Sequence, residues 1–228
     1  MAAVSFVIPV LNEAEVLPAL LQHLRGAFPD AQLVVVDGGS TDGSPALAET
    51  LCDQLLHSEP GRARQMNAGA LAASGDYLLF LHADSVPGIT REGLQRALAE
   101  RPTWGFCRVQ LSGDDWRFRV ISRLINWRSR LTRVATGDQM LFVASAVFRE
   151  SGGFDDIPLM EDVAFSKRLR KVAPPRILSD PVVTSSRRWR ERGVLRTVLQ
   201  MWALRLAFWC GMSPQRLHRS YYGTQSRG

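Results

Sequence analysis

Three short apolar runs near the start of the chain predict buried strands. Ser5–Val10, Gln32–Val36 and Tyr77–Leu81 are almost continuously apolar, which is typical of strands buried on both faces of a parallel sheet. Segments with helical spacing of apolar residues alternate with these runs. In chain order they are Val16–Leu24, Ser44–Leu56, Gly61–Ala73 and Thr90–Glu100. The alternation predicts an α/β fold whose mostly parallel central sheet is flanked by helices on both faces.

The second half of the chain is less regular. Apolar runs predict further strands at Trp104–Leu111, Gln139–Val147 and Val182–Ser186. Amphipathic or apolar helical spacing predicts helices at Trp116–Val134, Asp162–Lys171 and Val194–Phe208. We therefore expect one α/β domain over residues 1–190, followed by an amphipathic helix and tail over residues 191–228.

Polar residues follow each of the three early strands at its carboxyl end. These clusters are Leu11-Asn12-Glu13, Asp37-Gly38-Gly39-Ser40 and His82-Ala83-Asp84. In open α/β sheets, ligands bind just beyond the carboxyl ends of the strands. A single cluster is explained by ordinary turn chemistry, but three in succession predict a ligand site at this edge.

Composition places the chain among packed globular proteins. Hydrophobic residues make up 46% of the 228 residues and charged residues 22%, which excludes global disorder. The three cysteines are far apart and form no CxxC pair, so neither a disulfide framework nor a zinc site is expected. The first ten residues resemble a strand more than a signal peptide, and no apolar stretch reaches the roughly 20 residues of a membrane span. We therefore expect a cytoplasmic protein.

The charge is unevenly distributed. Residues 1–100 hold 5 arginines and 12 acidic residues, whereas residues 101–228 carry the excess of arginine that gives the chain its net charge of +6. A basic half can meet an anionic membrane, or its arginines can lie on solvated helix faces. No zinc-finger spacing or RNA-binding aromatic motif is present, so no nucleic-acid partner is expected.

The segment VVVDGGSTDG delivers Asp37 to the end of a buried strand. Its glycine pair, which includes Gly38, lets the backbone turn sharply and approach a ligand closely. A carboxylate there can accept hydrogen bonds from a nucleobase or a ribose. The alternative is a tight turn in which Asp37 only caps the chain. A dinucleotide site is not expected, because no GxGxxG motif opens the first helix.

The segment GDYLLFLHADS places His82 and Asp84 at the end of another strand. Residues i and i+2 of a strand share one face, so both side chains can address one ion. Asp84 suits Mg²⁺ or Mn²⁺, which take oxygen ligands and can bridge a diphosphate. His82 suits Mn²⁺ better than Mg²⁺. The alternative for Asp84 is a capping role in the following turn.

Two further segments carry candidate chemistry at helix starts. Arg62 and Arg64 begin a helix that is otherwise small and apolar, and arginines at a helix N-terminus suit a phosphate. Glu161 and Asp162 begin a later helix, whose dipole favours an ionised carboxylate that can act as a general base. Solvated side chains and simple helix capping are the alternatives at the two places.

Together these segments resemble the family 2 glycosyltransferases of GT-A fold, a Rossmann-like architecture. The resemblance covers roughly residues 4–171 and is carried, in order, by VIPVLNEAEVL, VVVDGGSTDG, NAGALAASGDYLLFLHAD, GDQMLFV and GGFDDIPLMEDVAFSKRLR. The segments HAD, TGDQMLF and PLMEDV are similar to those of a bacterial subgroup described as radical-SAM- or selenodomain-associated transferases. Some members of this subgroup are linked to arsenosugar biosynthesis.

The resemblance implies a role for each matching residue. Asp84, with His82 as a weaker second ligand, would face a divalent cation, Mn²⁺ or Mg²⁺. Asp162 would be the catalytic base and Glu161 would orient it or the acceptor. The sugar and acceptor region would be bordered by Gly137, Asp138 and Gln139. The donor nucleotide and diphosphate would lie against Pro9, Asn12, Glu13, Asp37, Gly38, Arg62, Arg64, Asn67 and Ala83.

The resemblance implies transfer of a sugar from a UDP or GDP donor to an acceptor hydroxyl, with inversion at the anomeric carbon. Two departures from the family pattern stand out. The family's DXD motif has become His82-Ala83-Asp84, and the QxxRW motif of processive synthases is absent. Two other functions stay open: a non-catalytic nucleotide-sugar or carbohydrate-binding relative, and a sugar-phosphate nucleotidyltransferase, although the Gly-rich loop of the latter is missing.

The C-terminal segment 194–212 has an apolar stripe of its own. Helical spacing aligns Leu195, Leu199, Trp202, Leu206 and Trp209. Such stripes usually pack into a core, so we expect this one to pack on the sheet or in a homodimer interface. The alternative is an interfacial helix that seats the protein peripherally on the inner face of the cell membrane.

Overall fold

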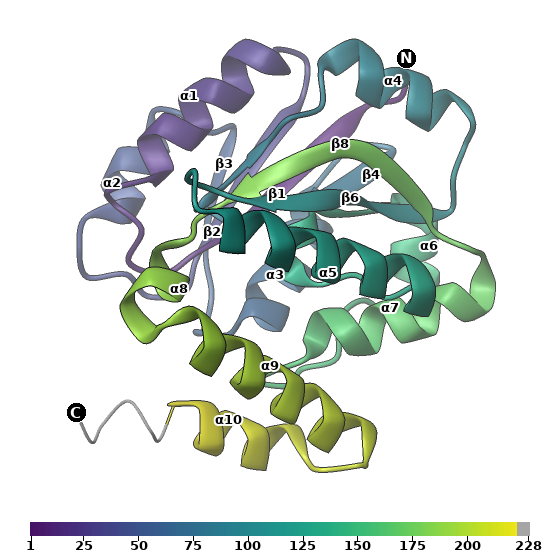
Figure 1. The fold of residues 1–228 in the computed structure, drawn as a ribbon. Helices are drawn as coiled ribbons and strands as arrows, with labels where there is room; N and C mark the ends of the chain where they lie inside the picture. The colour runs from purple at the N-terminus through teal and green to yellow at the C-terminus, as the bar shows by residue number, and fades with distance from the viewer. Residues whose placement is uncertain (223–228) are drawn as a thin grey trace.

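The computed structural model describes residues 1–222; at Arg188, Glu191, Arg192, Val194, Leu195, Tyr221 and Tyr222 only the backbone is described. Its strands are β1 (Val4–Val10), β2 (Gln32–Asp37), β3 (Gln54–His57), β4 (Tyr77–Phe80), β5 (Ser85–Pro87), β6 (Trp104–Leu111), β7 (Leu141–Ala144) and β8 (Arg176–Thr184). They form one sheet in the order β3-β2-β1-β4-β7-β6-β8-β5, which Figure 1 shows running through the centre of the molecule.

Helices connect these strands and cover the sheet. They are α1 (Leu17–Ala27), α2 (Ser44–Glu49), α3 (Arg62–Ala72), α4 (Arg91–Ala99), α5 (Trp116–Thr132), α6 (Ser145–Glu150), α7 (Glu161–Val172), α8 (Arg187–Arg192), α9 (Val194–Trp209) and α10 (Pro214–Tyr222), with a 3₁₀ turn, η1, at Gly137–Gln139. The expected α/β class with helices on both faces is therefore confirmed.

The first four strands are parallel, and their pairing aligns their carboxyl ends. Val10 at the end of β1 lies opposite Asp37 of β2, which in turn lies opposite His57 of β3. On the other side of β1, Val7 pairs with Phe80 of β4. The polar residues that follow β1, β2 and β4 therefore meet at one edge of the sheet, as the sequence predicts.

Alternate residues of the strands build a core on each face of the sheet. Phe6 and Ile8 point to one face and Val7 to the other, which is the period of two of a strand. The first core joins the sheet to α1 and α4, and the second joins it to α3, α6 and α7. Figure 1 shows the same division, with α1 and α4 above the sheet and α3 and α7 below it.

The structure corrects three of the predicted elements. The helix expected at Ser44–Leu56 ends at Glu49, and the residues that follow form β3. The strand expected at Gln139–Val147 is only β7, because η1 precedes it and α6 follows it. The strand expected at Val182–Ser186 is the end of the longer β8. In all three places short apolar runs do not distinguish a strand from a helix.

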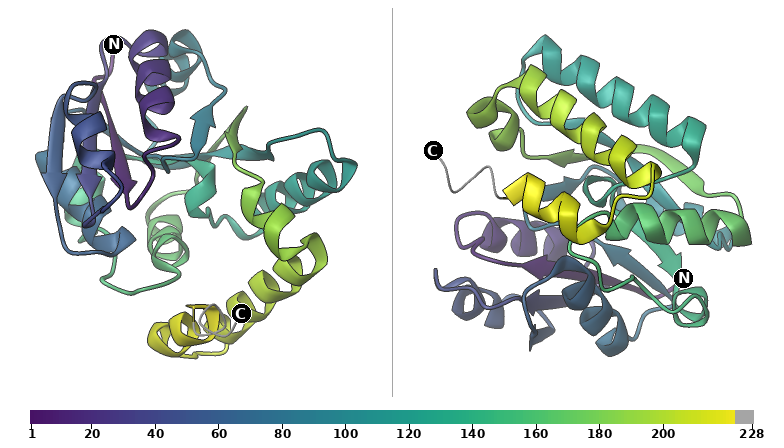
Figure 2. Two further views of the ribbon diagram at one scale, coloured as in Figure 1. Left: turned by 90° about the vertical axis from the view of Figure 1, so that its left-hand side faces the viewer. Right: turned by 90° about the horizontal axis from the view of Figure 1, so that it is seen from below.

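The C-terminal helices α9 and α10 project from the sheet, as the turned views of Figure 2 show. Leu204 of α9 and Leu217 of α10 are buried in a cluster with Met160 and Val163. The stripe that we expected to pack, by contrast, is exposed at Leu199, Trp202, Leu206 and Trp209; the side chain of Leu195 lies outside the described residues.

The helix α9 therefore packs through its other face. This reverses the predicted orientation, because α9 is apolar on both faces and the spacing alone does not select the buried one. In residues 1–222, no helix is both long enough and apolar enough to cross a membrane.

Two glycine-to-alanine substitutions in helices test the packing of α3 on the sheet. A Cβ at Gly69 would lie 2.5 Å from Cγ1 of Val7 and 2.9 Å from Cγ2 of Val36, whereas a Cβ at Gly26 of α1 meets nothing within 4 Å. We expect Gly69→Ala to lower the free energy of unfolding by about 1–3 kcal/mol through overpacking.

Gly26→Ala is the matched control, and we expect it to be neutral or to stabilise by up to about 1 kcal/mol through helix propensity. Urea unfolding of both variants measures the difference. Equal stability of the two variants would contradict the close approach of α3 to β1.

Candidate active site

The loop after β2 is organised by Asp37. Its carboxylate accepts hydrogen bonds from the backbone N–H groups of Gly39 at 3.0 Å and Ser40 at 3.1 Å, and Nδ1 of His57 lies 3.6 Å from it. Burial raises the pKa of Asp37, but the hydrogen bonds from Ser40, Gly39 and His57 outweigh it and hold the pKa below its usual value. The carboxylate is therefore ionised and fixed at the sheet edge.

The expected nucleotide-pocket residues of the first loop are tied into the same turn. Asn12 adopts a left-handed backbone, with φ of 55°, and its Oδ1 accepts the N–H of Thr41 at 2.8 Å. The N–H of Glu13 donates to Oγ of Ser44 at 2.9 Å. Pro9 is half-buried within β1. These contacts clamp the two loops together at the carboxyl ends of β1 and β2.

Gln65 is a structural residue of this edge that sequence reasoning missed. It is buried, and its Nε2 donates to the carbonyl oxygens of Val10 at 2.7 Å and Val36 at 2.8 Å. A Cβ at Gly38 would lie 3.0 Å from its carboxamide. Gly38 therefore gives α3 room to approach the strand ends, which is a packing reason for the glycine besides the turn.

Asp84 lies close to Glu13 beyond the ends of β4 and β1. Burial and the charge of Asp84 raise the pKa of Glu13, while Arg187, Arg62 and His82 oppose them. The described residues contain no closed cluster of three His, Cys, Asp or Glu side chains. Mg²⁺ and Mn²⁺ shared with a diphosphate commonly need only one or two carboxylates, with phosphate and water as the other ligands. Asp84, with Glu13 beside it, fits such a cation.

His82 faces a different neighbour. It is buried, and its Nδ1 lies 3.5 Å from Oδ1 of Asp138. A Cβ at Gly137 would lie 2.5 Å from Cε1 of His82, so the imidazole packs directly beneath the turn at η1. The structure thus places His82 between the strand end and the η1 turn, where it supports Asp138.

The three candidate residues of α3 separate in space. Arg62 lines the cleft between α7 and η1. Arg64 is engaged by Asp156, whose carboxylate accepts from Nε at 2.9 and 3.0 Å. The carboxamide of Asn67 donates to the carbonyl of Phe154 at 2.8 Å and accepts its N–H at 2.9 Å. Arg64 and Asn67 therefore anchor the loop that leads into α7, and Arg62 is the one of the three that lines this cleft.

Asp162 is fixed at the start of α7. Its Oδ2 accepts the N–H of Gly137 at 2.6 Å, and its Oδ1 accepts the N–H of Val163 at 2.6 Å. Met160, which precedes the helix, has a left-handed backbone with φ of 70°, a strained conformation of the kind that clusters at functional sites. Asp162 lines the same cleft as Arg62 and His82.

Glu161 lines the same cleft as Asp162 but is only 6% exposed. Burial raises the pKa of Glu161 to about 7, and the charge of Asp162 adds to this effect, whereas Arg62 and His82 oppose it. A carboxyl group whose pKa is raised by burial and by a neighbouring acid is typical of functional sites.

The η1 turn is built on Gln139, which is fully buried. Its Oε1 accepts from Oγ of Ser129 at 2.8 Å and from the N–H of Thr136 at 3.1 Å. Gln139 therefore lies behind the cleft and positions the turn, while Gly137 and Asp138 line the cleft itself. We expected Gly137, Asp138 and Gln139 to border the sugar and acceptor region. The structure places only Gly137 and Asp138 at the surface of the cleft.

The helix α9 closes one side of the cleft, through Met201, Leu204 and Arg205. A second arginine, Arg128 of α5, lies near Arg205, Asp162 and Asp138, whose charges all act on it. Sequence reasoning assigned α9 no part in the active site. The only signal was an arginine within an apolar helix, which also fits a solvated helix face.

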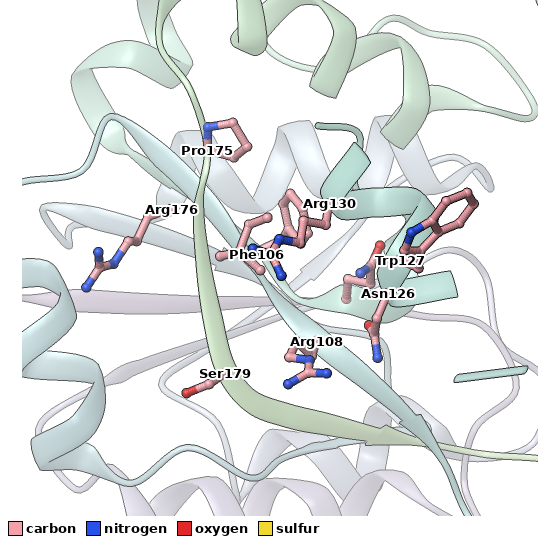
Figure 3. Close-up of a pocket in the computed structure, with 10 residues that line it drawn as sticks. Phe106, Arg108, Asn126, Trp127, Arg130, Pro175, Arg176 and Ser179 are labelled. Atoms are coloured by element: carbon pink, nitrogen blue, oxygen red, sulfur yellow. The ribbon is translucent and has the colours of Figure 1, made fainter. Parts of the chain in front are cut away.

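A larger cleft of about 580 Å³ lies elsewhere, over the amino-terminal halves of β6 and β8. Figure 3 shows Arg108 of β6, Arg130 and Trp127 of α5, and Arg176 of β8 around it. None of the sequence-predicted site residues except the buried Gln139 lines it. Ligands of open α/β sheets bind at the opposite strand ends, so the cleft beside Asp162 remains the candidate active site.

The raised pKa of Glu161 predicts how stability depends on pH. A folded-state pKa above the ordinary 4.5 means that the stabilisation present in acid is lost as pH rises through the folded pKa. Between about pH 4.5 and 7, we expect Glu161→Gln to gain stability relative to the wild type, on the order of 1–3 kcal/mol by neutral pH.

Chemical unfolding at several pH values measures this change. Glu92→Gln on the first turn of α4 is the matched control and should show no comparable rise. A constant difference between Glu161→Gln and the wild type across that range would rule out the shift.

Comparisons with known proteins identify relatives of this chain. The chain is 42% identical over 88 residues to a PGL/p-HBAD biosynthesis glycosyltransferase of Mycobacterium bovis, which covers 35% of this chain and 34% of the relative. It is 36% identical over 151 residues to an undecaprenyl-phosphate 4-deoxy-4-formamido-L-arabinose transferase of Serratia proteamaculans, which covers 60% of this chain and 45% of the relative. The chain thus spans less than half the length of these relatives.

Solved structures share the fold. TarS of S. aureus in complex with UDP-GlcNAc superposes with a TM-score of 0.64 at 18% identity, over 81% of this chain and 59% of TarS. A mannosyltransferase of Pyrobaculum calidifontis in complex with GDP-Man and Mn²⁺ gives a TM-score of 0.62 at 25% identity, over 90% of this chain and 61% of that one. The family described as Glycosyl transferase family 2 matches residues 5–150, more than half of the chain, and the protein therefore belongs to glycosyltransferase family 2.

Proposed function

We propose that the protein is an inverting glycosyltransferase, which moves a sugar from a nucleoside-diphosphate donor to a hydroxyl group of an acceptor. The observation that carries the proposal is the position of Asp162. The N–H of Gly137 holds its carboxylate at 2.6 Å on a cleft that Arg62 and His82 also line. A general base needs this combination of fixed geometry and access to the substrate.

The transfer step requires one proton acceptor. The acceptor oxygen forms a bond to the anomeric carbon from the face opposite the leaving group, the bond from that carbon to the diphosphate oxygen breaks, and the hydroxyl proton passes to Asp162. Attack from the opposite face inverts the anomeric configuration. Burial and the charge of Asp162 raise the pKa of Glu161 to about 7, which favours its protonated form more than in an ordinary carboxyl group, so we assign the base to Asp162 and a positioning role to Glu161.

The departing diphosphate needs positive charge near Asp84. Arg62 and Arg187 both act on Glu13, which lies close to Asp84, and guanidinium groups bind phosphate oxygens through two parallel hydrogen bonds. When bound at Asp84, a divalent cation would neutralise the charge that grows on the leaving group. In support, one structural neighbour contains GDP-Man and Mn²⁺ and another contains UDP-GlcNAc. We propose a UDP or GDP donor.

Further details of the proposal rest on the sequence. The segments TGDQMLF and PLMEDV support membership of the bacterial subgroup described as radical-SAM- or selenodomain-associated transferases. The family match ends at residue 150, whereas α9 lines the cleft through Arg205. We therefore propose residues 1–190 as the transferase domain and residues 191–228 as an extension that completes the acceptor side.

Asp162→Asn tests the assignment of the base. The amide cannot accept the proton, so we expect transfer to slow by about 10²–10⁴-fold, while nucleotide binding stays unchanged. Calorimetric titration with UDP and GDP, with and without Mn²⁺, measures binding, and hydrolysis or transfer of the matching nucleotide sugar measures turnover.

Asp84→Ala is the complementary variant in this experiment, and we expect it to lose the binding that Mn²⁺ adds. Near-normal turnover by Asp162→Asn, or retention of the anomeric configuration in the product, would overturn the mechanism. Nucleotide binding without turnover by the wild type would indicate a non-catalytic relative.

We also propose peripheral contact with an anionic membrane, on the inner face of the cell membrane, through α9 and the neighbouring α5. Trp202 and Trp209 of α9 are 66% and 75% exposed, and Trp116 and Trp127 of α5 are 65% and 64% exposed. The two helices share a cluster through Ile125 and Val198, and the right-hand view of Figure 2, seen from below, shows them side by side.

The residues around these tryptophans suit a membrane surface. Exposed Arg117, Arg119 and Arg123 lie on α5 and Arg196 on α9. Tryptophan with arginine is typical of helices that lie in the interface of an anionic bilayer, and a name among the relatives refers to an undecaprenyl phosphate. The alternative is that residues 194–212 form a homodimer interface at this surface.

Liposome flotation tests the membrane contact. We expect the wild type to float with vesicles that contain anionic lipid, and the double variant Trp202→Ala, Trp209→Ala to stay largely in solution, because burial of large aromatic side chains supplies much of the binding free energy. Leu71→Ala, at an 81% exposed position of α3, is the control and should float like the wild type. Equal flotation of all three proteins would exclude the membrane contact. A wild-type dimer in sedimentation that the double variant no longer forms would also exclude it.

A further inference from the structure

Two half-buried arginines lie beside the proposed base. Arg205 of α9 lines the cleft together with Asp162, and Arg128 of α5 lies close to both. Burial lowers the pKa of Arg128 to about 9, and the charge of Arg205 adds to this, whereas Asp162 and Asp138 oppose it. Burial also lowers the pKa of Arg205, again opposed by Asp162 and Asp138. Two like charges thus lie close together where water reaches them only in part.

The protein leaves these two charges incompletely paired. Nη2 of Arg128 donates to Oγ of Ser129 at 2.6 Å, but its buried Nε has no hydrogen-bond partner in the described structure. Among the side chains that the structure describes, no salt bridge joins Arg128 or Arg205 to an acid. A buried guanidinium nitrogen without a partner is destabilising, so an additional anion beside the pair would be favourable.

Two arginines near the proposed donor diphosphate, Arg62 and Arg187, act on Glu13 beyond the ends of β1 and β4, and Arg62 also reaches the cleft. The charges of Asp162 and Asp138 act instead on Arg128 and Arg205. The helix α5 packs on β6 through Asn126, which bonds both backbone groups of Val109. In the sheet, β7 separates β6 from β4 and from the donor-side strands. The pair thus lies on the acceptor side of Asp162.

The cleft beside Asp162 is small. Its volume is about 90 Å³, and its walls include Arg205, Asp138 and Asp162 as well as the apolar Met201 and Leu204. Ligand pockets that hold a whole small molecule measure about 300–1,000 Å³. The cleft therefore suits one phosphate or carboxylate group, with the remainder of the acceptor outside.

We propose that Arg128 and Arg205 form an anion subsite that binds a phosphate or carboxylate group of the acceptor. This inference rests on the glycosyl transfer proposed above and names the class of its acceptor: a hydroxyl compound that carries an anionic group. The arginines hold the anion and take no part in the exchange of bonds. The acceptor hydroxyl still loses its proton to Asp162 as its oxygen bonds to the anomeric carbon and the diphosphate leaves.

Phenyl phosphate is a suitable probe of the subsite. Calorimetric titration is done with Mn²⁺ and saturating UDP or GDP, so that the diphosphate site is filled. We expect the wild type to bind phenyl phosphate and not benzyl alcohol. Arg128→Gln and Arg205→Gln should each weaken binding by about tenfold or more, since each removes charge-assisted hydrogen bonds. Arg196→Gln, an exposed arginine of α9, is the matched control and should bind like the wild type.

The same experiment distinguishes failure of the proposed function from failure of the subsite. Wild-type protein that binds no nucleotide would refute the proposed function. In that case, the affinities of Arg205→Gln and Arg196→Gln for phenyl phosphate still test the subsite. Equal phosphate affinity in these two variants would overturn the inference. Thermal unfolding of Arg205→Gln checks that α9 stays packed, and Arg128→Gln tests the subsite from a different helix.

A second arm identifies the source of the anion. Polyprenyl phosphate in detergent micelles is titrated beside phenyl phosphate. If the wild type binds polyprenyl phosphate more tightly than phenyl phosphate, and Arg205→Gln weakens that binding, the anion is lipid-linked. Equal binding of both probes assigns a soluble anion.

Discussion

The parallel pairing of β1 with β2 and β4 is the constraint on which the rest of the structure depends. It carries Val10 and Asp37 to the same level of the sheet, so that loops far apart in sequence meet at one edge. Gln65 then bonds the backbone of both strand ends and fixes α3 against them. Because α3 also anchors the turn at Phe154 through Asn67, the start of α7 and its acids take their position from that edge.

Much of this arrangement can be predicted from the sequence, because buried parallel strands have a distinctive pattern. Continuous apolar runs that end in polar clusters predict the sheet edge and place Asp37 and Asp84 at it, whereas the place of Asp162 in the site was implied by the resemblance to the family. The motif pattern does not distinguish a residue that touches a ligand from one that holds a loop, since both must be polar. Asn12 and Gln139 are examples, because the side-chain hydrogen bonds of both go to the protein.

The C-terminal region was the least predictable part of the fold. The helix α9 carries apolar residues on both faces, so its periodicity fixes a helix but not the face that is buried. The choice depends on contacts with Met160 and Val163, about forty residues earlier in the chain, and a local pattern contains no information about them. The same choice turns Arg205 inward and Trp202 outward, which is why sequence reasoning missed a wall of the cleft.

The separation between the sheet and α9 has an evolutionary consequence. The side chains near Glu13 and Asp84 depend on β1, β2 and β4, where a substitution disturbs the core as well as the chemistry. The helix α9, by contrast, contributes to the cleft from outside the sheet, through a small cluster of its own. Substitutions in this helix therefore leave the core of the sheet untouched. Under the proposed division of the site, related chains can diverge in the compound they glycosylate while the residues at the strand ends stay the same.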